Sequence, residues 1–226
     1  TASSSNPGLI PDPTISGTGG TLSVNYAPRA NLSGMATITV TVDDGDGETD
    51  SADFVVTVTP VNDPPTLVSF GAAIDTTNED TQVELSFSEL AAQGDQADVD
   101  GTVEAFVVKT VSSGTLLIGI DAGSATPFAA GSNDTIDATR LAYWTPDLNA
   151  NGTLNAFEVV AQDDLGAEST TNVVAQIDVT PVNEPPTLAC FGAAIDTTYE
   201  DTQVELSFGE LAAQGDQADV DGTVDA

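Results

Sequence analysis

The sequence is poor in the residues on which most catalytic and redox chemistry depends. It has no histidine, one cysteine (Cys190) and one lysine (Lys109), and only 5% of its 226 residues are aromatic. Zinc sites, histidine acid–base chemistry, Schiff bases and internal disulfides therefore have almost no side chains to form them. No apolar stretch reaches the roughly 18 residues of a membrane helix, so no membrane span is predicted. These absences exclude most enzyme classes.

Positive charge is also nearly absent. Thirty-six acidic side chains oppose 3 basic ones, which gives a formal net charge of −33 at pH 7. Nucleic acid is excluded as a partner, because a phosphate backbone is bound through Lys and Arg. Anionic membrane surfaces are disfavoured for the same reason. The apolar content of 40% is nevertheless high enough for packed cores, so the chain is expected to fold.

A long internal repeat organises the chain. Residues 60–66 return as residues 181–187, a period of 121, and residues 63–105 match residues 184–226 at 37 of 43 positions. The chain is therefore predicted to contain the C-terminal part of one repeat (1–62), a complete repeat (63–183) and the N-terminal part of a third (184–226).

The secondary-structure pattern is that of short strands. Apolar residues alternate or run in segments rich in Val, Ile, Thr and Phe, separated by Gly, Asn, Asp and Pro clusters. Residues 36–42 and 52–59 are predicted to form a hairpin around the turn 43–47, and one helical turn is expected at 89–93. An all-β, immunoglobulin-like antiparallel sandwich accounts for this pattern. The other predicted strands are 83–87, 103–111, 115–120, 154–161 and 173–179.

Three motifs give the chain a family resemblance. They are the Thr-Pro-Val-Asn-Asp-Pro-Pro-Thr linker at 59–66, the Tyr-x-Pro-x-x-Asn-x-x-Gly segment at 26–34, and the Val-x-Val-Asp-Asp-Gly-Asp-Gly hairpin at 40–47. In these motifs the chain resembles the cadherin-like and immunoglobulin-like tandem repeats of large secreted bacterial adhesins of the RTX type and of surface fibre proteins. The resemblance implies tandem sandwiches joined by Pro-rich, calcium-binding linkers, and a structural role in an extracellular or cell-surface fibre.

The resemblance also implies where calcium would bind. Cadherins place a Glu before the second strand, an Asp-x-Asp after it, an Asp at the last hairpin and an Asn-Asp in the linker. Their further Asp-Arg-Glu segment is missing here, and Glu184 stands in the second linker where the first has Asp63. The implied ligands at the first junction are Asn62, Asp63, Asp98, Asp100, Asp163 and Asp164. Those at the second are Glu79, Asp80, Asn149, Asn183, Glu184, Asp219 and Asp221, completed by Asp43 and Asp44 of the next repeat. Glu200 and Asp201 are the equivalent of the Glu79-Asp80 pair in the third repeat.

Elementary chemistry supports calcium independently of the family. Ca²⁺ takes six to eight oxygen ligands, and Asp, Glu, Asn and backbone carbonyls are concentrated at the predicted joints. Without a cation, clustered carboxylates repel one another. Single motifs also have interpretations that need no metal. Asp43 and Asp44 could belong to an ordinary hairpin turn, and Asp98 and Asp100 to an ordinary acidic turn. The Asp-x-Asp motif recurs beside a second linker, which favours calcium binding over an ordinary turn for this motif.

Two further functions are weighed against the fibre. Paired carboxylates could cleave glycosidic bonds, but their recurrence at joints and the scarcity of aromatic residues argue against an enzyme. A carbohydrate-binding module, with a glycan or cell-surface ligand, is the alternative function. The incomplete repeats at the two ends leave two accounts of self-association open. Either the array continues covalently, or chains assemble head to tail by strand exchange into a homopolymer.

Overall fold

The computed structural model describes residues 1–18, 21–221 and 223–224. These residues form two compact units. The first comprises Thr1–Thr66, Ala97–Val103 and Gln162–Ser169, and the second comprises Leu67–Gln96, Glu104–Ala161 and Thr170–Ala226. The repeat boundaries predicted after residues 62 and 183 rest on sequence repetition and stay a prediction.

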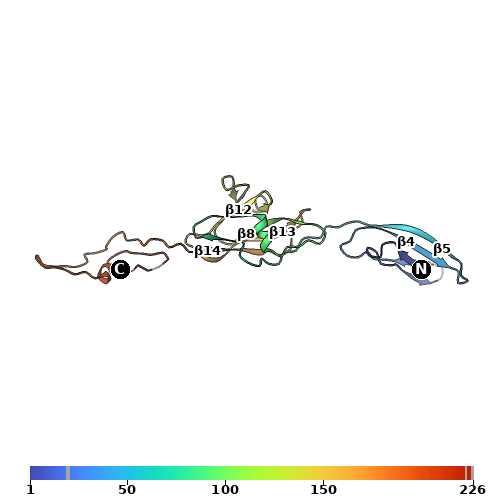
Figure 1. Cartoon of the computed structure of the whole chain (residues 1–226), viewed down its shortest axis with the longest axis horizontal. Coiled ribbons are helices and arrows are strands. Elements are labelled where there is room, and N and C mark those ends of the chain that lie inside the picture. The colour runs from blue at the N-terminus through green and yellow to red at the C-terminus, as the bar shows by residue number, and fades with distance from the viewer. Residues whose placement is uncertain (19–20, 222, 225–226) are drawn as a thin grey trace. The chain divides into compact units, whose positions relative to one another are not determined.

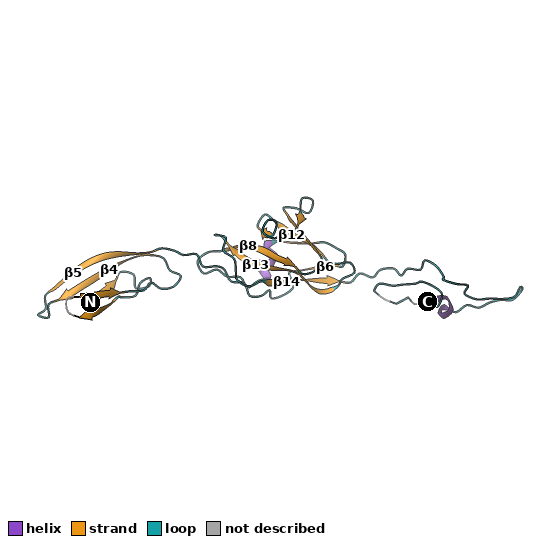
Figure 2. Ribbon diagram, turned by 180° about the vertical axis from the view of Figure 1, so that it is seen from behind, coloured by secondary structure: helices purple, strands orange, loops and turns teal. Residues whose placement is uncertain are grey.

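Strands dominate both units, as predicted for an all-β chain (Figures 1 and 2). Within the described residues they pair into four sheets, with the strand orders β1-β4-β5, β2-β3, β10-β9-β12-β7 and β11-β8-β13-β14-β6. The strands are β1 (Ala2–Ser4), β2 (Thr14–Thr18), β3 (Thr21–Asn25), β4 (Gly34–Asp43), β5 (Thr49–Val58), β6 (Asp75–Asn78), β7 (Val83–Leu85), β8 (Val103–Val111), β9 (Thr115–Gly119), β10 (Thr126–Pro127), β11 (Thr135–Asp137), β12 (Leu141–Thr145), β13 (Gly152–Asp163) and β14 (Val173–Thr180), and the helices are α1 (Phe87–Gln93) and α2 (Phe208–Ala212).

The β4–β5 hairpin confirms the hairpin predicted in the first unit. The two strands pair without interruption from Gly34 opposite Val58 to Asp43 opposite Thr49. Strand side chains alternate between faces, so Ala36 and Ile38 both point into a small core that they share with Leu9 and Ile10. The turn of residues 44–48 contains Gly45 and Gly47 at φ 86° and 103°, a conformation that glycine adopts without strain.

The four-stranded and five-stranded sheets form an immunoglobulin-like β-sandwich (Figure 2). Phe106 of β8, Trp144 of β12 and Phe157 of β13 are fully buried in its core. The predicted strands that correspond to β7, β8, β9, β13 and β14 are confirmed. Strand β12 was not predicted, because Ala142, Tyr143 and Trp144 are all buried and give no alternating pattern.

Two short elements complete the sandwich. The helix predicted at 89–93 is confirmed as α1, which is longer by two residues at its start and is preceded by the N-cap Ser86, in a capping box with Glu89. One pairing departs from the antiparallel prediction, since β6 lies parallel to β14, with Asp75 opposite Ile177. The sequence of β6 is polar, Asp-Thr-Thr-Asn, and carries no hydrophobic signal for an edge strand.

The third copy of the repeat is less structured than its equivalent in the complete repeat. The isolated bridges Thr187–Ala218 and Phe191–Gly215 reproduce those of Thr66–Ala97 and Phe70–Gly94, and α2 repeats the capping box of α1. Residues 196–199 and 204–206, which correspond to β6 and β7, are not strands. Among the described residues, no helix is long and apolar enough to cross a membrane.

Candidate functional site

The structure brings the six acidic and amide residues predicted at the first junction into one hydrogen-bonded cluster within the first unit. The linker reaches the Asp98–Asp100 loop because the backbone N–H of Asp63 lies 3.3 Å from both carboxylate oxygens of Asp100. It reaches the β13 hairpin because the amide Nδ2 of Asn62 donates to Oδ2 of Asp163 at 2.7 Å. The segments 62–63, 98–102 and 163–164 thus meet although they are far apart in sequence.

Asp163 is the anchor of this cluster. Its side chain is only 4% exposed. Besides the bond from Asn62, its Oδ1 accepts the backbone N–H groups of Leu165 at 3.0 Å and Ala167 at 2.7 Å. The donation from Asn62, followed by these backbone groups, lowers the pKa of the Asp163 carboxyl despite its burial. Asp163 is therefore held as a carboxylate that fixes both its own turn and the linker.

Asp98 and Asp164 converge on Gly101. A Cβ atom at Gly101 would lie 2.4 Å from Oδ1 of Asp164 and 3.5 Å from Oδ2 of Asp98, so a side chain there would displace a carboxylate. Oδ1 of Asp98 accepts the backbone N–H groups of Asp100 and Gly101, at 3.0 and 2.8 Å. Its Oδ2 is buried and has no hydrogen-bond partner among the residues that the structure describes. A buried carboxylate oxygen without a donor is costly unless something else balances it.

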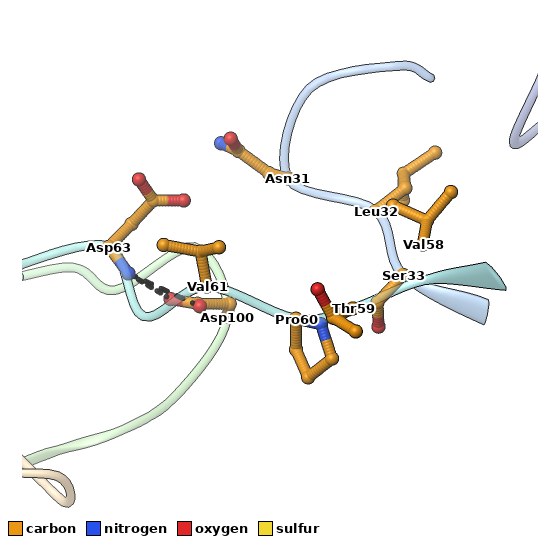
Figure 3. A pocket seen from close by; sticks show the side chains of 9 residues that line it. All are labelled: Asn31, Leu32, Ser33, Val58, Thr59, Pro60, Val61, Asp63 and Asp100. Atoms are coloured by element: carbon orange, nitrogen blue, oxygen red, sulfur yellow. Dashed lines mark hydrogen bonds between the residues drawn. The ribbon is translucent and has the colours of Figure 1, made fainter. Parts of the chain in front are cut away.

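A shallow cavity of about 270 Å³ borders the same cluster (Figure 3). Residues 31–33 line one side of it, and the linker, with Asp63 and Asp100, lines the other. Figure 3 shows the side chains of Asn31 and Asp63 extending to the same side of the linker. Asn31 was not among the residues predicted for this junction. The signal was available, because Asn31 is the repeat equivalent of Asn149, which was predicted at the second junction.

A second cluster in the other unit forms around Glu79, which is 6% exposed. Its Oε1 accepts the backbone N–H of Val182 at 2.5 Å, and its Oε2 accepts Nδ2 of Asn151 at 3.3 Å. The linker that leaves the complete repeat is therefore held by a buried carboxylate, as the linker that enters it is held by Asp163. Asn151 is a second site residue that the motif comparison missed, because it lies outside the matched motif positions.

Asp80 and Asn149 lie together beside Glu79. Both have a left-handed backbone, with φ of 58° and 59°, and the backbone N–H of Asn149 donates to Oδ1 of Asp80 at 3.0 Å. The side-chain Oδ1 of Asn149 is buried, and no group in the described part of the chain donates a hydrogen bond to it. Each of the two clusters therefore contains one buried oxygen with no donor, Asp98 Oδ2 in the first and Asn149 Oδ1 in the second.

The second linker also reaches the copied Asp-x-Asp motif. The backbone N–H of Glu184 donates to Oδ2 of Asp221 at 3.1 Å, and the N–H of Asp221 donates to Oδ1 of Asp219 at 3.2 Å. Asn183, in contrast, donates to the carbonyl of its neighbour Glu184. The linker residues 182–184 thus contact Glu79 on one side and Asp221 on the other.

Four predicted ligands are not joined to these clusters by any described hydrogen bond. Asp43 and Asp44 accept backbone N–H groups of their own hairpin turn, from Gly45 and from Asp46 and Glu48, respectively. The donors from Asp46 and Glu48 lower the pKa of the Asp44 carboxyl. Glu200 and Asp201 are exposed, although Asp201 keeps the left-handed backbone of Asp80, at φ 59°. Their assignment to calcium sites stays a prediction.

The clusters fit calcium in their chemistry. Among residues 1–18, 21–221 and 223–224, no three acidic side chains already converge into a group that could hold a metal ion. Calcium, however, also takes Asn side-chain oxygens, backbone carbonyl oxygens and waters as ligands, and these can add to the carboxylates gathered at the two linkers. The partnerless oxygens of Asp98 and Asn149 are oxygens that a cation would satisfy.

A comparison with protein families finds one match, in the first part of the chain. Residues 3–57 match the family described as a bacterial Ig domain. This match supports the immunoglobulin-like part of the predicted resemblance and indicates no enzymatic family. The match to the Ig family does not extend to the cadherin-like and adhesin-specific features, which stay predictions. No curated protein matches the chain.

Two solved structures show a distant similarity. One is that of fibronectin(III)-like modules of Clostridium thermocellum CbhA, at 16% identity and a TM-score of 0.27, covering 71% of this chain and 72% of that one. The other is Bacteroides ovatus SGBP-B, from a mixed-linkage glucan utilization locus, in complex with a mixed-linkage heptasaccharide. Its identity is 19% and its TM-score 0.20, over 84% of this chain and 41% of that one. At these TM-scores neither structure bears on function.

Proposed function

We propose that this chain is a structural repeat module of a bacterial extracellular fibre or adhesin stalk, and that calcium at its junctions makes the array rigid. The module itself carries out no chemistry. Its work is to hold successive sandwiches at a fixed spacing and to resist bending between them. The ligand at the end of such a stalk would be bound by another part of the assembly.

The observation that supports this proposal most directly is that buried carboxylates of the complete repeat hydrogen-bond to both of its linkers. A buried carboxylate holds each linker: Asp163 through Asn62, and Glu79 through Val182. A further aspartate holds each linker one or two residues later. Asp100 accepts the backbone N–H of Asp63, and Asp221 accepts the backbone N–H of Glu184. A module that only needed a flexible tether would not bury carboxylates to fix it.

Charge explains why a cation would matter. The chain has 36 acidic side chains and only 3 basic ones, so its own residues cannot neutralise the joints. Self-repulsion at this net charge opposes compact packing, and a bound divalent cation would relieve it locally. Binding only to the ordered joint would stabilise it by about 2.7 kcal/mol at a free calcium concentration of 100 times Kd.

The test is calorimetric titration of calcium into the full chain, paired with thermal unfolding in calcium and in excess chelator. We expect saturable binding and a higher Tm with calcium. The double variant D98N/D100N should lose a large part of the binding at the first junction and of the Tm gain. A matched control, D53N/E104Q, removes two exposed carboxylates outside both clusters and should keep both. Equal melting in calcium and chelator would contradict the proposal.

A glycan-binding surface is the second candidate, and one observation favours it. Tyr26 and Phe54 form an exposed aromatic pair, with ring centroids 6.3 Å apart and the side chains 44% and 39% exposed. Trp144, the equivalent of Tyr26 in the complete repeat, is fully buried. Such a surface would therefore be particular to residues 1–62. A glycan array with the full chain tests it, and Y26A should abolish any signal that this pair produces.

A further inference from the structure

The loop that leads into strand β13 contains a chemically labile pair of residues. Asn151 is followed by Gly152, and the sequence contains no other Asn-Gly pair. In such a pair the backbone nitrogen of the glycine can attack the side-chain carbonyl carbon of the asparagine, because glycine has no Cβ to hinder the approach. The ring that forms then opens with water and leaves an acidic residue. Asparagine is one of the thermolabile residues for this reason.

The structure leaves this pair open to the reaction. The side chain of Asn151 is exposed, and a Cβ atom built on Gly152 would meet no described atom within 4 Å beyond its chain neighbours. Gly152 is the first residue of β13, opposite Val179, and the end of a strand opens more readily than its middle. Within the described residues, a single side-chain hydrogen bond restrains the amide, from Nδ2 to Oε2 of Glu79 at 3.3 Å.

Asn133 shows the opposite situation and serves as an internal standard. It is half-buried, and its Nδ2 donates to the carbonyls of Thr126 and Pro127 at 2.9 and 3.0 Å. Its Oδ1 accepts the guanidinium of Arg140. The next residue is Asp134, whose side chain hinders the backbone nitrogen. Because both ends of this amide are held, it should be far less reactive.

We propose that Asn151 is a deamidation site, and that the carboxylate formed there weakens the attachment of the second linker to Glu79. The nitrogen of Gly152 bonds to Cγ of Asn151, and the bond from Cγ to Nδ2 breaks. Nδ2 leaves as ammonia, which takes up the proton of the Gly152 N–H. Water then adds to one carbonyl of the ring and breaks its bond to nitrogen, which gives aspartate or isoaspartate. The reaction consumes one water and releases one ammonia, with no oxidation or reduction.

The position of the new carboxylate determines its effect. Nδ2 of Asn151 donates to Oε2 of Glu79, so deamidation replaces this donor with an anionic oxygen. Glu79 is 6% exposed, and like charges repel strongly where water screens them poorly. The other oxygen of Glu79 accepts the backbone N–H of Val182 in the second linker. Repulsion that displaces the Glu79 carboxylate therefore releases the linker as well.

The same change should make this joint more dependent on calcium, a consequence that rests on the proposed function. Asp80 follows Glu79 and accepts the backbone N–H of Asn149. A carboxylate at position 151 would be the third acidic group of the cluster, and the buried Oδ1 of Asn149 is a further oxygen beside it. Carboxylate and amide oxygens are calcium ligands. Deamidation should thus weaken the joint in chelator and strengthen calcium binding.

Peptide mass spectrometry of the full chain tests the reaction. The protein is incubated in chelator at mildly alkaline pH and sampled over time. We expect Asn151 to show the mass change of an NH₂-to-OH exchange many times faster than Asn133. N151Q is the matched control, because its longer side chain would have to close a larger ring, and it should stay intact at this position. Equal rates at positions 151 and 133 would overturn the proposal.

The variant N151D tests the consequence directly. In chelator, the Val182 N–H should exchange with deuterium about tenfold or more faster than in the parent, because a second charge beside a poorly screened carboxylate opposes the native contact. N155D adds the same charge further along β13 and keeps the oxygen that accepts Nε2 of Gln176 at 2.8 Å. It should exchange as the parent does. Equal exchange in all three proteins would overturn the proposal.

The outcomes separate this inference from the calcium proposal. Calcium should restore the protection of the Val182 N–H in N151D and bind more tightly to N151D than to N155D. Deamidation at Asn151 and faster exchange in N151D, with no effect of calcium on any of these proteins, would support the modification site and contradict the proposed function. An Asn151 that stays intact, in a chain whose Tm rises in calcium, would overturn the modification site alone.

Discussion

Asn62 and Asp163 are 101 residues apart in sequence, and the side-chain amide of Asn62 donates a 2.7 Å hydrogen bond to the Asp163 carboxylate. The carboxylate is buried and also accepts two backbone N–H groups of its own turn. This bond ties the linker to the hairpin at the end of β13.

Removing the amide should loosen the linker without unfolding the sandwich. N62A deletes the donor, so the backbone N–H groups of residues 61–63 should exchange faster with solvent deuterium. N183A is the matched control at the repeat position, because within the described residues the side chain of Asn183 donates to the carbonyl of its neighbour Glu184 and to no carboxylate. Hydrogen-exchange mass spectrometry measures both variants. Equal protection of the first linker in N62A and the parent would contradict the role given to this bond.

The same bond predicts a pH dependence. Donation from Asn62, then from backbone N–H groups, lowers the pKa of Asp163. A carboxyl with a lowered folded pKa stabilises the fold above its unfolded pKa of about 3.9, and this contribution is lost as pH falls through the folded pKa. NMR titration of the Asp163 Cγ should give a midpoint below the ordinary Asp value, and N62A should raise that midpoint. A midpoint at or above the ordinary value would be inconsistent with the geometry.

Gly101 tests the convergence of Asp98 and Asp164. In G101A the new methyl group would lie 2.4 Å from Oδ1 of Asp164, so that carboxylate must leave the Thr102 N–H that it accepts at 3.2 Å. We expect the fold to survive, because the obstacle is the end of a side chain, and calcium affinity at this junction to fall about tenfold or more, since each lost 1.4 kcal/mol is tenfold. G71A, whose methyl would meet nothing nearer than 3.7 Å, should bind as the parent does.

Glu79 should contribute more to the free energy of unfolding than its copy Glu200. E79A leaves the Val182 N–H and the Asn151 amide without their acceptor, which should lower the free energy of unfolding by about 1–3 kcal/mol. E200A removes an exposed side chain and should change it by no more than about 0.5 kcal/mol. Urea unfolding measures both. Similar losses in the two variants would show that Glu79 does not hold the linker.

Much of the fold could be predicted from the sequence, because its strands alternate and its turns carry Gly, Asn and Asp. The hairpin β4–β5, strand β8 and helix α1 were predicted in this way. Strand β12 was not, because its buried residues are consecutive, and β6 was not, because an edge strand of Asp and Thr has no apolar face. The absence of strands in residues 196–206 could not be predicted from the sequence, since residues 75–85, which differ from them only by Asn78 in place of Tyr199, contain strands β6 and β7.

The site was predictable in outline and not in detail. Repetition identified the linker and the Asp-x-Asp loop, and the structure brings Asp63 and Asp100 into contact. Asn151 was missed because its role depends on the three-dimensional approach of its loop to Glu79. The unpaired oxygens of Asp98 and Asn149 depend on burial, which no spacing rule gives.

The most direct test of the central claim is the distribution of distances across the first junction, measured between two spin labels. Labels at V42C in the first unit and I120C in the second, in a C190S background, occupy exposed positions outside the clusters. We predict a broad distribution in chelator, a narrow one in calcium, and a distribution that stays broad in calcium for D98N/D100N. A width that calcium does not change would contradict the claim that calcium stiffens this joint.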